Sequence, residues 1–129
     1  MRVTEKETIE VVEQVLIEFN SEIIEALKEQ QCTSQTINSK ENNIMTVTQE
    51  NEELGFVGTP TKINKSIIDK IVDEKKVPVI APLGLDENNQ AHNINADTAA
   101  GSIAKKIEAR RLIIMSDVEG VLDLSLIHI

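Results

Sequence analysis

Two apolar runs flank a short helical pattern in the second half of the chain, and their order limits the folds available to it. The first run, "VPVIAPLG", covers residues 77–84 and is apolar at consecutive positions, as in a strand buried on both faces. The second run, "RLIIMS", covers residues 111–116, and the segment between the two has helical spacing. Strand, helix and strand in this order predict a right-handed crossover between parallel strands. Side chains at the carboxyl ends of such strands share one edge of the sheet, where ligands bind.

The N-terminal part of the chain predicts one long amphipathic helix over residues 5–30. Thr4 and Glu7 have the spacing of a capping box. Apolar residues then recur at alternating intervals of three and four, at Ile9, Val12, Leu16, Phe19, Ile23 and Ala26. More apolar residues widen this face beyond what packing on one side requires, at Val11, Val15, Ile17 and Ile24. We therefore expect the helix to cover a sheet, and the wide face leaves a subunit contact open as an alternative.

The middle of the chain predicts short strands followed by a second helix. From residue 31 to residue 63, β-branched and polar residues alternate in "TVTQ" and "TKIN", between Asn, Gly and Pro. The segment "NKSIIDKIVDEKK" then returns to helical spacing, and "DENNQ" after the first apolar run predicts a turn. This mixture of elements predicts the α/β class.

Composition argues against several classes of partner and site. The chain has 129 residues, enough for one domain, and its 13 basic and 22 acidic residues give a net charge of -9. Such a charge disfavours binding to nucleic acid or to a membrane surface. Cys32 is the only cysteine, so an internal disulfide is impossible and no zinc motif exists. With no signal peptide core or apolar run of about 18 residues, we expect a cytoplasmic location.

The stretch "HNINADTAAG", residues 92–101, holds the candidate site. Residues two apart on a strand point to the same side, so Asn93 and Asn95 could reach one ligand while Ile94 faces the core. Asp97 is expected at the N-cap of the next helix. The inward face of that helix would comprise Ala100, Ile103, Ala104 and Ile107. Polar residues ahead of a helix also serve as caps and turns, so the local pattern leaves both interpretations open.

Other catalytic motifs are missing from the sequence. It contains neither GxGxxG nor GxxxxGK[ST], and its five glycines are scattered. His92 and His128 show no Asp or Ser partner for a hydrolase triad, and we interpret both as bystanders. If the protein handles a nucleotide, its main phosphate loop is not in these residues.

Four segments, taken in order, form a more specific signature. They are "RVTEKETIEVVEQVL", "LGFVGTPTKIN", "VPVIAPLGLDENNQAHNINADTAAGSIA" and "RLIIMSDVEGVLD". Together, over residues 2–123, they resemble the acetylglutamate kinases of the amino-acid kinase family. The resemblance implies a three-layer α/β sandwich with a mainly parallel central sheet, incomplete in this chain. Residues 1–109 would be part of the N-terminal acetylglutamate-binding domain, residues 110–123 would begin the C-terminal ATP-binding domain, and residues 124–129 would be a non-native tail.

The resemblance implies ATP-dependent phosphorylation of the side-chain carboxylate of N-acetyl-L-glutamate in arginine biosynthesis, with Mg²⁺ accompanying ATP and no metal bound by the protein. Arg2 and Asn93 match substrate-binding positions, and Asp97 matches the aspartate that organises two catalytic lysines. Asn95 would hold the strand end that presents Asn93. The nucleotide-binding positions match Ser116, Asp117, Val118, Glu119, Gly120, Val121 and Leu122. Residues 5–30 match the helix through which the family forms homodimers.

The chain also departs from the family pattern. The Lys-Gly-Gly phosphate loop, a second glycine pair and the second catalytic lysine have no match here, so we expect this chain alone to be inactive. "NSKEN", residues 38–42, stands where relatives have Ser-Gly-Lys-Asp-Gly, and "LSLIHI" matches nothing in the family. Two alternatives stay open: a sister kinase acting on aspartate, glutamate, carbamate, uridylate or carrier-bound aminoadipate, and a non-catalytic module that dimerises through residues 5–30.

Overall fold

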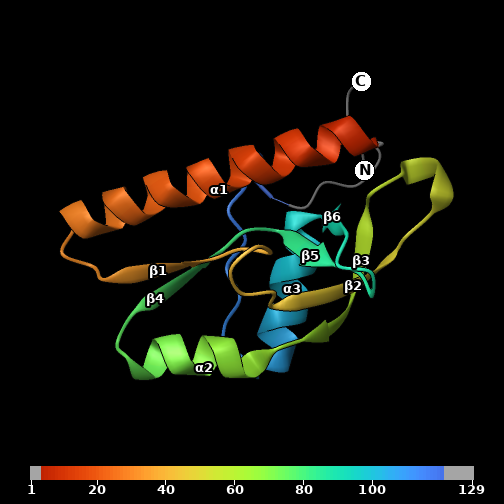
Figure 1. Cartoon of the computed structure of the whole chain (residues 1–129). Coiled ribbons are helices and arrows are strands. Elements are labelled where there is room, and N and C mark those ends of the chain that lie inside the picture. Colours follow the sequence, from red (N-terminus) through yellow and green to blue (C-terminus); the bar gives the residue numbers. More distant parts are fainter. Residues whose placement is uncertain (1–3, 121–129) are drawn as a thin grey trace.

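The computed structural model describes residues 4–120, and these residues form three layers (Figure 1). Helix α1, Lys6–Glu29, covers one face of the strands, while α2, Lys65–Asp73, and α3, Ala96–Lys106, lie on the other. The strands are β1, Ser34–Ile37; β2, Met45–Gln49; β3, Gly58–Ile63; β4, Val77–Ile80; β5, Leu83–Leu85; and β6, Ala91–Asn93, with a short 3₁₀ helix, Glu52–Leu54, before β3. This layering confirms the predicted α/β class.

The strand layer consists of two hydrogen-bonded sheets. Strands β1 and β4 pair in parallel, and the second sheet has the order β3-β2-β5-β6. Within it β2 and β5 are parallel, whereas the β2–β3 and β5–β6 pairs are antiparallel. The first apolar run therefore does supply a parallel strand, but the prediction of a strand buried on both faces is wrong, since Val77 is exposed and the rest of β4 is half-buried. The chain then turns at Ala81 and Pro82 and enters the second sheet as β5.

Apolar side chains hold the helices to both faces of the strands. On the side of α2 and α3, the buried cluster comprises Ile37, Ile44, Met45, Val47, Ile63, Ile68, Ile71, Ile94 and Ala99. On the side of α1, a smaller cluster comprises Ile9, Ala81, Leu83 and Ala91, with Val12 and Leu16 packed against it. Since burying one large aliphatic side chain stabilises a fold by roughly 1.5–3 kcal/mol, these clusters account for the position of each helix.

Helix α1 begins and ends within one residue of the predicted bounds, but the predicted capping box is wrong. Its N-cap residue is Glu5, and no side chain caps the helix there. Thr4 is buried and joins the loop before β3 instead, since its N–H donates to Leu54 O over 2.8 Å and its carbonyl accepts from Phe56 N–H over 2.7 Å. Among residues 4–120, no helix has the length and apolar character needed to cross a bilayer.

Asn20 is a buried polar residue on the inner face of α1, and its side chain joins the helix to both strands of the smaller sheet. Only 4% of Asn20 is exposed. Its Nδ2 donates to Thr36 Oγ1 over 3.0 Å and to Val79 O over 3.1 Å, and lies 3.5 Å from Ile37 O. The amide thus adds side-chain hydrogen bonds from α1 to oxygens of both β1 and β4.

The predicted second buried strand, residues 111–116, is not formed. Ile113 and Met115 are 80% and 92% exposed, whereas Leu112 and Ile114 are 47% and 51% exposed. A strand requires the N–H and C=O groups of a neighbour, and no backbone hydrogen bond described for residues 4–120 joins this segment to β4. The predicted crossover is therefore not completed within the described part of the chain.

Candidate functional site

The hairpin of β5 and β6 places Asn93 at the end of a short, firmly held strand. Asn93 lies opposite Leu83 in the antiparallel ladder. On its other side, the N–H of Asn93 donates to Phe56 O over 2.8 Å, and Val57 forms a parallel bridge with it. Because β6 has only three residues, these contacts on both edges determine the backbone position of Asn93.

Asn93, Ile94 and Asn95 all line one groove, although β6 ends at Asn93 and the strand alternation does not extend to Asn95. Ile94 between them is 2% exposed, and its N–H donates to Pro82 O over 3.0 Å. The groove has a volume of about 560 Å³ and runs between this segment and α1. Its remaining lining residues are Val11, Val12, Val15, Leu16, Pro82 and Ala96. Two asparagines thus line a mainly apolar groove, which suits a small ligand that has both polar groups and an aliphatic part.

The N-cap of α3 is Asn95, and the prediction of Asp97 at this position is wrong. Asn95 Oδ1 accepts from the backbone N–H of Thr98 over 3.1 Å and lies 3.3 Å from Thr98 Oγ1. The helix begins at Ala96, so Asn95 is the residue whose side chain can reach the third helical N–H. Asp97 lies exposed in the first turn, where the positive end of the helix dipole favours its carboxylate.

The buried His92 pairs with the half-buried Asp86 beside this site, so the interpretation of His92 as a residue without an acidic partner is wrong. His92 is 3% exposed, and its Nε2 lies 2.9 Å from Asp86 Oδ2. Burial raises the pKa of Asp86, but hydrogen bonds from His92 and from the N–H groups of Gln90 and Asn88 outweigh it, so this pKa lies below its ordinary value. A clue was present in the sequence, because the predicted turn "DENNQ" begins with an acid and a histidine follows two residues after it.

The turn after β1 is held by hydrogen bonds of its own side chains. Asn38 Oδ1 accepts from the N–H groups of Lys40 and Glu41 over 3.0 and 3.1 Å. Ser39 Oγ donates to Glu13 Oε1 over 2.8 Å, which attaches the turn to α1. Asn38 and Ser39 are both buried, and sequence reasoning did not identify them as structural residues.

The predicted nucleotide-binding residues are only partly described. Ser116 to Gly120 form an exposed bend, in which Val118 N–H donates to Ser116 Oγ over 3.3 Å. No hydrogen bond or ion pair described for residues 4–120 joins Asp117 to Asn93 or Asp97. Arg2, Val121 and Leu122 lie outside the described residues. In the part that is described, no group of three or more His, Cys, Asp or Glu side chains is placed to hold a metal.

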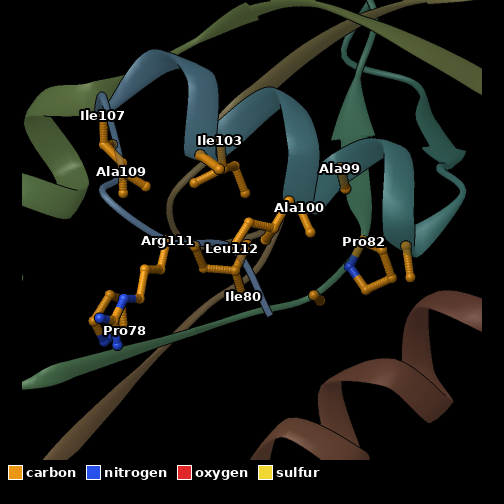
Figure 2. Close-up of a pocket in the computed structure, with 13 residues that line it drawn as sticks. Pro78, Ile80, Pro82, Ala99, Ala100, Ile103, Ile107, Ala109, Arg111 and Leu112 are labelled. Atoms are coloured by element: carbon orange, nitrogen blue, oxygen red, sulfur yellow. The ribbon is translucent and has the colours of Figure 1, made fainter. Parts of the chain in front are cut away.

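A separate cavity of about 340 Å³ lies between α3 and β4 (Figure 2). Ala99, Ala100 and Ile103 of α3 form one wall, and Figure 2 shows Leu112 beside Ile80 on the other side. Among the described residues that line this cavity, Arg111 is charged. The small side chains of α3 leave the space open. Both this cavity and the groove beside Asn93 are mainly apolar, and the groove is the stronger candidate site because Asn93 and Asn95 of the predicted motif line it.

Comparison with known proteins bears on both the sequence and the fold. The profile of the amino acid kinase family matches residues 1–125. The acetylglutamate kinase of Pelagibacter ubique is 66% identical over 123 residues, which cover 95% of this chain and 43% of the relative. The acetylglutamate kinase of Roseobacter denitrificans is 40% identical over 121 residues, covering 93% of this chain and 42% of the relative. The chain thus spans less than half the length of these curated relatives.

Solved structures share the fold. The smu.665 protein of Streptococcus mutans superimposes with a TM-score of 0.89 at 29% identity, over 96% of this chain and 51% of that protein. The N-acetylglutamate synthase of Neisseria gonorrhoeae, solved with coenzyme A and N-acetyl-glutamate, gives a TM-score of 0.71 at 18% identity, over 84% of this chain and 26% of that protein. The second likeness concerns the fold alone. With a family match that runs over nearly its whole length, this chain belongs to the amino acid kinase family.

Proposed function

We propose that this chain provides the acetylglutamate-binding part of an acetylglutamate kinase. The observation that carries the proposal is that Asn93 and Asn95 face one groove, in a chain that is 66% identical to a curated acetylglutamate kinase over the aligned residues. In the proposed reaction, the side-chain carboxylate of N-acetyl-L-glutamate attacks the γ-phosphorus of ATP. The new P–O bond gives an acyl phosphate, and ADP leaves with the electrons of the broken bond.

This reaction requires few catalytic side chains. The attacking carboxylate is already ionised at neutral pH, so no general base is needed. Catalysis then consists of aligning two anions and neutralising the charge that develops on the transferred group. Mg²⁺ would arrive with ATP and be held by its phosphates. In the described part of the chain, no cluster of three or more metal-binding side chains is placed to hold it.

Each residue in the proposal has one role. The amide of Asn93 hydrogen-bonds the substrate, and Arg2 binds its α-carboxylate through two parallel hydrogen bonds. Asn95, by capping α3, holds the strand end that presents Asn93. Asp97 organises catalytic lysines that other parts of a longer protein would supply. Residues 116–122 begin the nucleotide site, so residues 1–109 and 110–123 would belong to different domains, with 124–129 as a non-native tail.

A chimaera tests the proposal, with the 123 aligned residues of this chain replacing their counterparts in the Pelagibacter ubique enzyme. We expect release of ADP that requires N-acetyl-L-glutamate, a raised KM for that substrate in Asn93→Ala, and a lowered kcat in Asp97→Ala. Asn88→Ala is the matched control, because Asn88 is exposed and lies in the turn of the same hairpin. Preference for aspartate, glutamate, carbamate, uridylate or aminoadipate would instead identify a sister kinase. For the 129-residue chain alone we expect no turnover, and turnover that Asp97→Ala abolishes would contradict this.

A dimer through α1 is a second proposal, supported by an exposed apolar stripe. Val11, Val15 and Phe19 follow one another at intervals of four and are 61%, 55% and 54% exposed. Side chains at this spacing lie on one face of a helix, where a second copy could cover them. Sedimentation at tens of micromolar tests this. A monomer would contradict it, and a dimer that Phe19→Glu dissociates would support it. We also propose a cytoplasmic location.

A further inference from the structure

His92 precedes Asn93 on β6, and its ring occupies a tight, largely apolar space. Neighbouring residues of a strand point to opposite faces, so His92 faces away from the groove that Asn93 lines. A Cβ atom at Gly58 would lie only 3.0 Å from His92 Cβ, so the glycine makes room for the histidine. The Phe56 ring lies against the imidazole with a centroid distance of 5.6 Å. The ring of His92 therefore has little freedom to move.

Asp86 ties this ring to the turn of the hairpin. Its Oδ1 accepts from the N–H groups of Asn88 and Gln90 over 2.8 and 3.0 Å, which fixes the turn. Its other oxygen, Oδ2, lies 2.9 Å from His92 Nε2. One carboxylate thus connects the turn to the residue next to Asn93.

The hydrogen bond determines where the proton of the imidazole resides. An ionised carboxylate can only accept, so His92 Nε2 must donate. His92 Nδ1 is buried and has no partner among the described residues. Among residues 4–120, the bond through Nε2 to Asp86 is therefore the hydrogen bond that holds the ring.

We propose that His92 is a positioning residue for Asn93: its hydrogen bond to Asp86 anchors β6, so that Asn93 stays bonded to Phe56 and keeps its side chain at the groove. The anchoring concerns the fold alone. Only its effect on substrate binding depends on the proposed function.

Amide hydrogen exchange of the 129-residue chain tests the anchoring directly. The Asn93 N–H reports local opening at the site, and the Ala81 N–H, bonded to Ile37 O in the other sheet, reports global opening. His92→Asn lacks the reach to Asp86, whereas His92→Gln carries an amide near the position of Nε2. We expect His92→Asn to accelerate exchange at Asn93 by about ten-fold without a matching change at Ala81, as the loss of one charge-assisted hydrogen bond implies. His92→Gln and the exposed control Asn88→Ala should exchange like the parent chain. Equal exchange in all four proteins would overturn the proposal.

Asp86→Asn provides a second test that does not depend on His92→Asn folding. The new amide can keep the turn through its oxygen and present its NH₂ group to His92. The imidazole must then accept at Nε2 and carry its proton on Nδ1, which long-range ¹H–¹⁵N spectra distinguish. We expect the tautomer to change in this way, while the Asn93 N–H stays protected from hydrogen exchange. A proton that stays on Nε2 would overturn the proposed bond.

A titration with N-acetyl-L-glutamate separates the two proposals. Binding by the parent chain that weakens about ten-fold in His92→Asn and is restored in His92→Gln supports both. If the parent chain does not bind but His92→Asn still exposes the Asn93 amide, the positioning role stands and the proposed function loses its support. Tight binding by His92→Asn overturns the positioning role and leaves the function standing.

Discussion

Replacing Asn20 by aspartate exchanges one NH₂ group for an oxygen at the junction of α1, β1 and β4. In the native chain this NH₂ group makes two short hydrogen bonds, to Thr36 Oγ1 and Val79 O, and a longer one to Ile37 O. Each short bond contributes about 1 kcal/mol net, so Asn20→Ala should lower the free energy of unfolding by about 2–3 kcal/mol, including the acceptors left unpaired.

Asn20→Asp should be worse than this truncation at neutral pH. A carboxylate at a position that is 4% exposed would face three oxygens, and a buried charge left without a partner typically costs about 3–5 kcal/mol. Burial and these oxygens would hold the pKa of the new carboxyl above its ordinary range. Destabilisation should therefore be greatest at neutral pH and diminish as the pH falls and the group becomes a neutral donor.

Urea unfolding followed by far-ultraviolet circular dichroism is the suitable assay, because the chain contains no Trp or Tyr for fluorescence. Asn51→Asp is the matched control: Asn51 is exposed and accepts from Glu53 N–H, so the same chemical change should cost less than about 0.5 kcal/mol. The reasoning is refuted if Asn20→Asp unfolds at the same urea concentration as Asn51→Asp at pH 7.

Three further predictions concern other parts of the fold. Gly55→Ala should lower the free energy of unfolding by more than about 2 kcal/mol, because Gly55 has φ of 67° and a Cβ there would lie 2.1 Å from Thr4 O. Gly101 lies on α3 with open space around it, so Gly101→Ala should raise the free energy of unfolding by about 0.5–1 kcal/mol. The urea midpoints of the two variants test both expectations. Asn95→Ala should cost about 1 kcal/mol through loss of the cap on α3 and Asn95→Asp almost nothing, and equal thermal midpoints would count against the cap. The pKa of Asp86 is lower in the folded protein than its ordinary value of 3.8, so its ionised carboxylate stabilises the fold at a pH above 3.8. This stabilisation is lost as the pH falls through the lower pKa of the folded state, and acid unfolding of Asp86→Asn should lack this component.

Features with a local period were predictable from the sequence. The apolar stripe of α1 recurs every three or four residues, and its bounds were nearly right. The buried position of Ile94 between the two asparagines was also predictable, although the strand ends at Asn93 and Asn95 already caps α3. The part of the groove formed by α1 was not predictable, since it depends on how a distant helix packs.

Features that depend on pairing between distant segments were missed. The segment "RLIIMS" has the composition of a strand, but composition does not provide the neighbour that a strand requires. The pairing of His92 with Asp86 depends on the register of a hairpin, and the role of Asn20 depends on two strands that follow it in sequence. The cap of α3 was misplaced because Asn95 and Asp97 are both good capping residues, and only the first helical residue decides between them.

The exposed segment of residues 112–115 should determine where the chain aggregates and where proteases cleave it. Its four residues are apolar, lack a strand partner in the described part of the chain, and alternate between half and nearly full exposure. An extended apolar segment with free N–H and C=O groups is a template for another strand, and it is also accessible to proteases. Aggregation and cleavage should therefore begin here, so a charged residue at Ile113 or Met115 is the first change to make when the chain is purified.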